Sequence, residues 1–242
     1  MDKYLTLLSF GPEGWGDELL SGALVTISVA LATLPFGLAL GLGVALAKRS
    51  DNRLLRAVGT AYTTIFRGVP ELLTLYIIYF GVQVLVQALW KGLGLPGTIE
   101  LSPFVSGVVA LGIVLGAFSA EVWLGALNAV HKGQREAAAA LGLSKAQTFR
   151  LVVLPQVFRV ALPGLGNNWM VLLKETSLVS VITLQDTMFI ATRANVTTKE
   201  PFLFFGVAML IYLFFSVISA TGLSRIEART NRAYAPAGGR RP

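Results

Sequence analysis

The sequence of 242 residues contains no cysteine and one histidine, His131. The lack of cysteine excludes disulfide bonds, thiol redox chemistry and metal sites built on cysteine. A single histidine excludes metal sites built on several histidines, and it excludes Ser-His catalysis elsewhere in the chain. No nucleophile, base and orienting group recur at a usable spacing. We therefore expect no metal site and no catalytic residue, and hence no enzyme.

Charged residues are also scarce. They make up 14% of the chain, and the mean hydropathy is +0.67. A soluble domain of this length would need more polar side chains to cover its surface. The composition therefore indicates an integral membrane protein.

A nucleotide-binding loop is missing as well. The phosphate-binding pattern G-x-x-x-x-G-K-[ST] does not occur. Gly92, Gly94 and Gly97 match the dinucleotide pattern G-x-G-x-x-G, but Pro96 lies inside the match and no strand precedes it, so we interpret this segment as a turn. We expect this chain to bind no cofactor. If ATP drives its function, another polypeptide must hydrolyse the ATP.

Five apolar segments can cross a bilayer as helices. The clearest is 22–47, which has no charged residue and is followed by Lys48 and Arg49. At about 1.5 Å per residue, this segment covers the roughly 30 Å hydrocarbon core with some tilt. The other expected spans are 72–89, extended back towards residue 60, then 103–130, 157–184 and 202–223. The expected fold class is thus an all-α integral membrane protein with five transmembrane helices.

Basic residues predict the orientation of these spans, because lysine and arginine concentrate on the cytoplasmic side. One side would carry Lys48, Arg49, Arg53, Arg56, Arg67, Lys132, Arg135, Lys145, Arg150, Arg159, Arg225, Arg229, Arg232, Arg240 and Arg241, and the other only Lys3, Lys91, Arg193 and Lys199. We therefore expect residues 1–17 outside, a membrane domain at 18–228, and a basic cytoplasmic tail at 229–242. The net charge of +7 indicates contact with anionic lipid and not with nucleic acid.

A helix-prone, basic segment follows the third expected span. Strong helix formers run from Glu136 to Leu141, Gly142 should stop the helix, and Ser144 should cap a second helix that begins at Lys145. The small side chains of 137–140 give the first helix a thin profile, so a partner's groove can approach its backbone. Arg135 and Glu136 are expected to anchor the rim of that contact.

The spacing of this segment resembles the EAA loop of permease subunits of bacterial ABC importers, which docks onto the ATP-hydrolysing subunits. The residues that carry this resemblance, and that are predicted to couple transport to ATP hydrolysis, are Arg135, Glu136, Ala137, Ala138, Gly142, Leu154 and Pro155. The resemblance implies a cytoplasmic coupling helix.

Four ionisable residues fall within or next to the expected spans: Glu71, Glu121, Lys174 and Glu175. Such groups are costly in hydrocarbon unless they are paired or face water. Asn168, Val171 and Glu175 share one helical face, which would suit a substrate that bears a cation. We therefore predict a substrate path formed by Glu71, Asn168, Val171 and Glu175. The alternative is that Glu175 forms a structural ion pair with a basic group elsewhere in the bundle.

Three further stretches, 161–178, 66–71 and 119–123, resemble the permeases of polar amino acids, most closely those for histidine, lysine, arginine or opines. The resemblance covers about residues 18–228. One departure is Leu124, where the family usually has arginine. It leaves open the role of that arginine, which could be to pair with Glu121 or to stabilise the cytoplasmic mouth, and so it leaves the partner of Glu121 open.

The resemblance implies a type I ABC importer permease fold in the bacterial inner membrane. It also implies a complex with two ATP-binding subunits, which hold ATP and Mg, a second permease subunit that is identical or homologous, and an extracytoplasmic solute-binding protein. The alternative function is a stand-alone amino acid carrier driven by an ion gradient. The small number of spans, the lack of a detectable inverted repeat and the EAA-like segment argue against that carrier.

Overall fold

A computed structural model describes residues 2–232, and within them the chain is helical and contains no strand. The elements in chain order are α1 (Asp2–Leu7), α2 (Gly16–Lys48), α3 (Arg53–Gly68), α4 (Glu71–Tyr76), η1 (Ile77–Gly81), α5 (Val82–Gly92), α6 (Pro103–Ala129), α7 (Lys132–Ala140), α8 (Lys145–Thr148), η2 (Phe149–Val153), α9 (Leu154–Glu175), η3 (Thr176–Ile182), α10 (Thr187–Thr198) and α11 (Pro201–Arg232). The segments η1 and η2 are π-helical turns, and η3 is a 3₁₀ helix.

Five helical segments in the described part of the chain are long and apolar enough to span a membrane. They are Gly16–Lys48, Glu71–Gly92, Pro103–Ala129, Lys145–Ile182 and Pro201–Thr230. This confirms the expected number of spans. The basic residues Arg240 and Arg241, which contribute to the predicted orientation, lie outside the described residues.

The expected extension of the second span back towards residue 60 is wrong. Residues 60–68 belong to α3, a separate helix that ends at Gly68, and Val69 is extended with ψ near 137°. Pro70 explains the break, because its ring disfavours a helical conformation at the preceding residue and it lacks an N–H to continue the hydrogen-bond ladder. The second span therefore begins at Glu71, which stands in the first turn of α4.

The helix α6 lies at the centre of the bundle and is the most buried of the five spans. Its contact with α2 is close because glycines face it. A Cβ atom at Gly41 would lie 2.0 Å from the Ser119 Oγ, and the Ser119 hydroxyl donates a hydrogen bond to the Gly37 carbonyl at 3.2 Å. Small residues at such a crossing let two membrane helices pack backbone to backbone.

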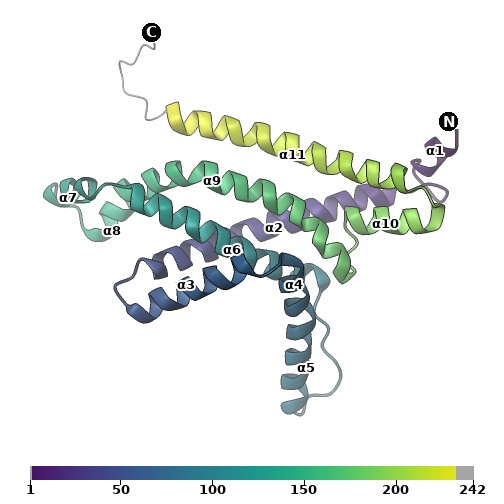
Figure 1. The fold of residues 1–242 in the computed structure, drawn as a ribbon, viewed down its shortest axis with the longest axis horizontal. Coiled ribbons are helices and arrows are strands. Elements are labelled where there is room, and N and C mark those ends of the chain that lie inside the picture. The colour runs from purple at the N-terminus through teal and green to yellow at the C-terminus, as the bar shows by residue number, and fades with distance from the viewer. Residues whose placement is uncertain (1, 233–242) are drawn as a thin grey trace, which may run out of the picture.

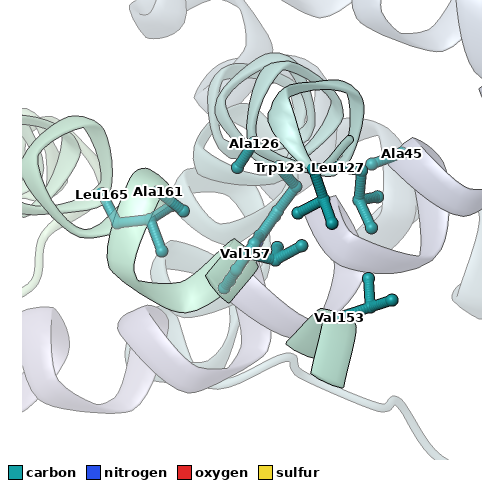
Figure 2. Packing of buried hydrophobic residues seen from close by; sticks show 9 residues of the cluster. Ala45, Trp123, Ala126, Leu127, Val153, Val157, Ala161 and Leu165 are labelled. Carbon is teal, nitrogen blue, oxygen red and sulfur yellow. The ribbon is translucent and has the colours of Figure 1, made fainter. Parts of the chain in front are cut away.

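An apolar cluster joins α6 and α2 to the start of α9. Figure 2 shows Trp123 and Leu127 of α6 beside Ala45 of α2 and Val157 of α9. The Trp123 indole donates a hydrogen bond to the Leu38 carbonyl at 3.2 Å. The helices α7 and α8 connect α6 to α9. The cluster therefore holds together the two helix ends to which α7 and α8 are attached.

The two ends of the bundle carry different short helices. Figure 1 shows α7 and α8 together at one end, and α1 and α10 at the other. The helix α5, which continues from α4, projects away from the remaining spans in the same view. The charged segment that links α6 to α9 is thus separated by the length of the bundle from the loop that precedes α10.

Candidate coupling segment and translocation path

The segment between α6 and α9 has the helix, break and helix that its sequence predicts. Gly142 adopts φ +79°, a left-handed conformation that favours glycine and ends α7. Ser144 and Gln147 then form a capping box: the Gln147 N–H donates to the Ser144 hydroxyl at 3.3 Å, and the Ser144 N–H donates to the Gln147 Oε1 at 2.9 Å. Leu154 and Pro155 stand in the first turn of α9.

One face of α7 is left open by the chain itself. Glu136 and Ala137 are exposed, whereas Ala138 is buried against the bundle. Arg135 is half-buried and lines a pocket beneath the helix. Sequence reasoning missed Leu141, which is 82% exposed directly after α7. An exposed leucine next to an exposed acid gives this turn both an apolar and a charged contact for a partner.

The structure brings three residues of the predicted substrate path together. Asn168, Val171 and Glu175 of α9 line one cavity of about 140 Å³. Sequence reasoning missed the opposite wall, which Leu115 and Phe118 of α6 provide. Their apolar side chains give no signal in the sequence that would separate them from ordinary core residues.

Glu71 also reaches this region, although it lies far away in the sequence. Its carboxyl group lies close enough to that of Glu175 for the two groups to interact. Lys174 lines a separate cavity between α9, α10 and α11, and it acts on Glu175 only as a charge at longer range. Within residues 3–230, whose side chains are described, neither Glu71 nor Glu175 forms an ion pair with a basic side chain. The expected alternative, a structural ion pair of Glu175, is therefore not found in the described chain.

Glu121 has the opposite surroundings. The Lys48 ammonium group forms an ion pair with its Oε1 and also donates a hydrogen bond to the Thr63 hydroxyl at 3.1 Å. The Arg67 guanidinium lies 3.8 Å from the same oxygen. These two cations, from α2 and α3, are the partners that the departure at Leu124 left open. Leu124 itself packs against the apolar cluster of Figure 2.

Phe118 stands between these two groups of charges. It lines the Glu175 cavity and also a larger cavity of about 430 Å³ that contains Lys48, Arg67 and Glu121. The Arg67 guanidinium lies over its ring, 5.5 Å from the centroid. The same aromatic side chain thus separates a pair of carboxylates from a cluster in which cations outnumber carboxylates.

Among the described side chains, residues 3–230, no group of three or more histidine, aspartate or glutamate residues could hold a metal ion. What the geometry can provide is a polar route for a solute between membrane helices, together with a surface for a partner protein at one end.

Comparison with known proteins gives consistent matches along the chain. The family model described as "Binding-protein-dependent transport system inner membrane component" matches residues 37–231. The nopaline transport system permease protein NocQ of Agrobacterium fabrum is 43% identical over 229 residues, which cover 94% of this chain and 97% of NocQ. The histidine/lysine/arginine/ornithine transport system permease protein HisQ of Salmonella typhimurium is 41% identical, with 89% and 94% covered.

A solved structure agrees with the fold. The crystal structure of an amino acid ABC transporter with histidines contains a chain with 31% identity and a TM-score of 0.74. The match covers 89% of this chain and 95% of that chain. The five spans and the loop between α6 and α9 therefore belong to an architecture that is already known in importers.

Proposed function

Because the chain belongs to the family of binding-protein-dependent transport system inner membrane components, we propose that it forms the translocation path for a cationic amino acid or an opine. It is a permease subunit of an ABC importer, as its relatives are. The names of these relatives include nopaline, histidine, lysine, arginine and ornithine. The ion-gradient carrier, the alternative function from the sequence, gains no support from them.

The main support for a cationic substrate is the neighbouring pair of carboxyl groups of Glu71 and Glu175. A carboxylate within a membrane needs a compensating cation or water. Among the described side chains no cation forms a direct ion pair with either carboxyl group, and Lys174 acts on Glu175 only as a charge at longer range. A guanidinium or ammonium group of the solute would provide the missing charge, while Asn168 would offer an uncharged hydrogen-bonding group beside it.

The Asn168 side chain adds a second reason to expect a polar ligand in the same cavity. Its Nδ2 is buried and has no hydrogen-bond partner among the described residues. A buried amide donor without an acceptor costs about 1–3 kcal/mol. The carboxylate of an amino acid is an acceptor of the required kind, so Asn168 and Glu175 together would bind the two oppositely charged ends of one solute.

We propose two ATP-binding subunits, a second permease subunit and an extracytoplasmic solute-binding protein as partners. ATP and Mg would be held by the ATP-binding subunits. The exposed side of α7, with Glu136 and Leu141, would dock onto one of these subunits. Closure of the ATPase pair would then move α7 and, through the apolar cluster at Trp123, the helices that line the path.

In the proposed orientation, α7 faces the cytoplasm and α10 faces the outside of a bacterial inner membrane. The excess of basic residues on the α7 side supports this orientation. The chain would thus accept solute from the side of α10 and release it on the side of α7.

Reconstitution of the whole complex in vesicles tests the proposed function. We expect uptake of labelled arginine that requires ATP and the solute-binding protein, that persists when ionophores collapse ion gradients, and that excess glutamine does not inhibit. Arginine uptake by this chain alone, driven by an ion gradient, would contradict an importer subunit. Equal competition by glutamine would contradict the cationic substrate class.

A further inference from the structure

A pocket of about 330 Å³ lies beneath the turn between α7 and α8, and three cations line it. Arg49 follows the last turn of α2, Arg135 comes from α7, and Lys145 begins α8. No carboxylate is among the described residues that line the pocket. None of the three cations forms an ion pair with a described residue. The pocket is therefore a concentration of positive charge without an internal counterion.

The two arginines are held close to one another. Burial and the charge of Arg135 both lower the pKa of Arg49 from its ordinary value. The Arg49 Nη1 donates a hydrogen bond to the Leu127 carbonyl at 3.2 Å, whereas the Arg135 Nε is buried and has no hydrogen-bond partner among the described residues. An anion with several acceptor oxygens would satisfy the free donor and offset the repulsion between the two guanidinium groups.

Apart from Thr148, the other residues that line the pocket are apolar, which a small inorganic anion would not require. Leu46 and Phe149 line it and remain 44% and 37% exposed. Leu46 also continues a series of exposed leucines on α2 that includes Leu20, Leu24 and Leu31. At 3.6 residues per turn, these four side chains fall within about 80° of one another around the helix axis. The same side of this membrane span thus carries exposed leucines and, at its end, a cationic pocket, with the partly buried Leu38 and Leu42 between them.

We propose that this pocket binds the headgroup phosphate of an anionic phospholipid, with one acyl chain lying along the exposed leucines of α2. An amphiphile matches both the cations and the apolar wall, and basic pockets between membrane helices on the cytoplasmic side suit such headgroups. A carboxylate of the ATP-binding subunit would match the cations alone. The lipid would bridge α2 to α7 and α8, and so hold the coupling segment at a fixed height above the membrane.

The test uses the assembled complex in nanodiscs made of phosphatidylcholine alone or of phosphatidylcholine with phosphatidylglycerol. The pocket variant carries Arg49→Gln and Lys145→Gln. The matched control carries Arg53→Gln and Lys132→Gln, which remove the same charge from exposed residues that do not line the pocket. Lipids that stay bound after transfer to detergent are identified by native mass spectrometry, and thermal unfolding of the complex is followed in parallel.

We expect the wild-type complex and the control to retain phosphatidylglycerol in preference to phosphatidylcholine and to unfold at a higher temperature in its presence. The pocket variant should retain it about thirtyfold more weakly, because each basic residue near the membrane surface contributes about 1 kcal/mol. Since the lipid preference is first measured on the wild-type complex, a pocket variant that fails to assemble leaves that part of the test intact.

Four outcomes would overturn the proposal. The first is a wild-type complex that retains both lipids equally. The second is an equal loss in the pocket variant and the control, which would indicate surface charge in general. The third is full stabilisation by inorganic phosphate in phosphatidylcholine discs, which would indicate a site for a free anion. The fourth is dissociation of the ATP-binding subunit from the pocket variant with lipid retention unchanged, which would indicate a protein contact.

Discussion

Glu121 of α6 and Glu175 of α9 both lie within membrane-spanning helices, yet their charged neighbours differ. Glu121 is bound by Lys48 and lies near Arg67, so its charge is compensated internally. Glu175 has a second carboxyl group, that of Glu71, as its neighbour. The cost of a charge in the membrane is thus offset by direct ion pairs within the chain at Glu121, whereas the described residues form none at Glu175. This difference separates a structural acid from one suited to a solute.

A third acid, Glu136, extends the comparison beyond the membrane. It is exposed on α7, where water compensates its charge in the isolated chain. Its proposed partner is another protein. The three acids therefore differ in the group that would compensate their charge. For Glu121 it is a side chain of the same chain, for Glu175 a solute, and for Glu136 a docked subunit. Mutations at each position should have correspondingly different effects.

The largest effect is expected at Glu136. Glu136→Lys reverses the charge at the proposed contact, and loss of a charged interface partner typically costs about 2–5 kcal/mol. We expect ATP hydrolysis stimulated by the loaded solute-binding protein to fall to its unstimulated rate, while the protein still reaches the membrane. Glu100→Lys, the same change in an exposed loop far from α7, serves as the control. Full stimulation and uptake in the Glu136 variant would rule out the docking role.

The next largest effect is expected at the compensated acid. Lys48→Met removes the principal partner of Glu121, and a hydrogen bond to a charged group contributes about 1.5–3 kcal/mol. We expect less assembled complex in the membrane and earlier thermal unfolding. Glu121→Met should cause a similar loss, and the double variant should recover part of it, because the two residues interact directly. Strictly additive losses in this cycle would mean that the ion pair does not stabilise the fold.

Glu175→Gln should behave in the opposite way. The substitution keeps the shape and an amide but removes the charge, so we expect normal assembly. The solute concentration for half-maximal arginine uptake should rise about ten- to a hundredfold, which corresponds to the loss of one charge-assisted hydrogen bond. Uptake assays over a range of solute concentrations, with Glu100→Gln as the control, provide the measurement. An unchanged half-saturation would place Glu175 with Glu121 as a structural residue.

Glu71→Gln should have a smaller effect of the same kind, because Glu175 would keep its charge. We expect half-saturation to rise by less than tenfold. The two variants together sharpen the comparison: if both carboxylates bind one cation, the combined variant should lose less than the product of the single effects predicts. Independent, multiplicative losses would indicate that the two carboxylates do not bind the same cation.

Sequence reasoning succeeded where the signal is local. The five spans follow from apolar composition, and the break in the coupling segment follows from Gly142 and Ser144. It failed at Val69 and Pro70, where length and hydropathy favoured one long span although the proline breaks the helix. In both successes and in this failure, the deciding residues lie within a few positions of the feature that they determine.

The partners of the acids could not be predicted because they depend on tertiary packing. Lys48 and Glu121 are 73 positions apart, and nothing in either segment identifies the other as its partner. The sequence indicates Lys48 as the boundary of the first span and as one of the residues that predict orientation, whereas its ammonium group in fact contacts Glu121 of α6. Phe118 was missed for the same reason, since its position between two cavities depends on how α3, α6 and α9 pack.

One further acid tests whether internal compensation must come from a cation. Asp186 precedes α10, outside the membrane-spanning segments, and is buried. Its Oδ1 accepts a hydrogen bond from the Phe189 N–H at 2.9 Å, and its Oδ2 accepts one from the Tyr212 hydroxyl at 3.4 Å. Burial raises the pKa of Asp186 from 3.8 to about 6, although the hydrogen bond from the Phe189 N–H opposes this rise.

The sign of the pH dependence follows from this raised pKa. The folded state holds the Asp186 proton more tightly than the unfolded state does, so stability falls as the pH rises from about 4 to about 6. Asp186→Asn keeps an acceptor for the Phe189 N–H and removes the charge. We expect this variant to be more stable than the wild type by about 3 kcal/mol at neutral pH and above, because each pKa unit corresponds to about 1.4 kcal/mol, with the gain disappearing as the pH falls towards 4. Thermal unfolding of the complex is measured over this pH range, with the exposed Asp51→Asn as the control. The result decides whether hydrogen bonds compensate the charge of Asp186 as well as a cation compensates that of Glu121. A variant that is less stable than the wild type at every pH would mean that the backbone N–H and the tyrosine hydroxyl compensate Asp186 as fully as Lys48 compensates Glu121.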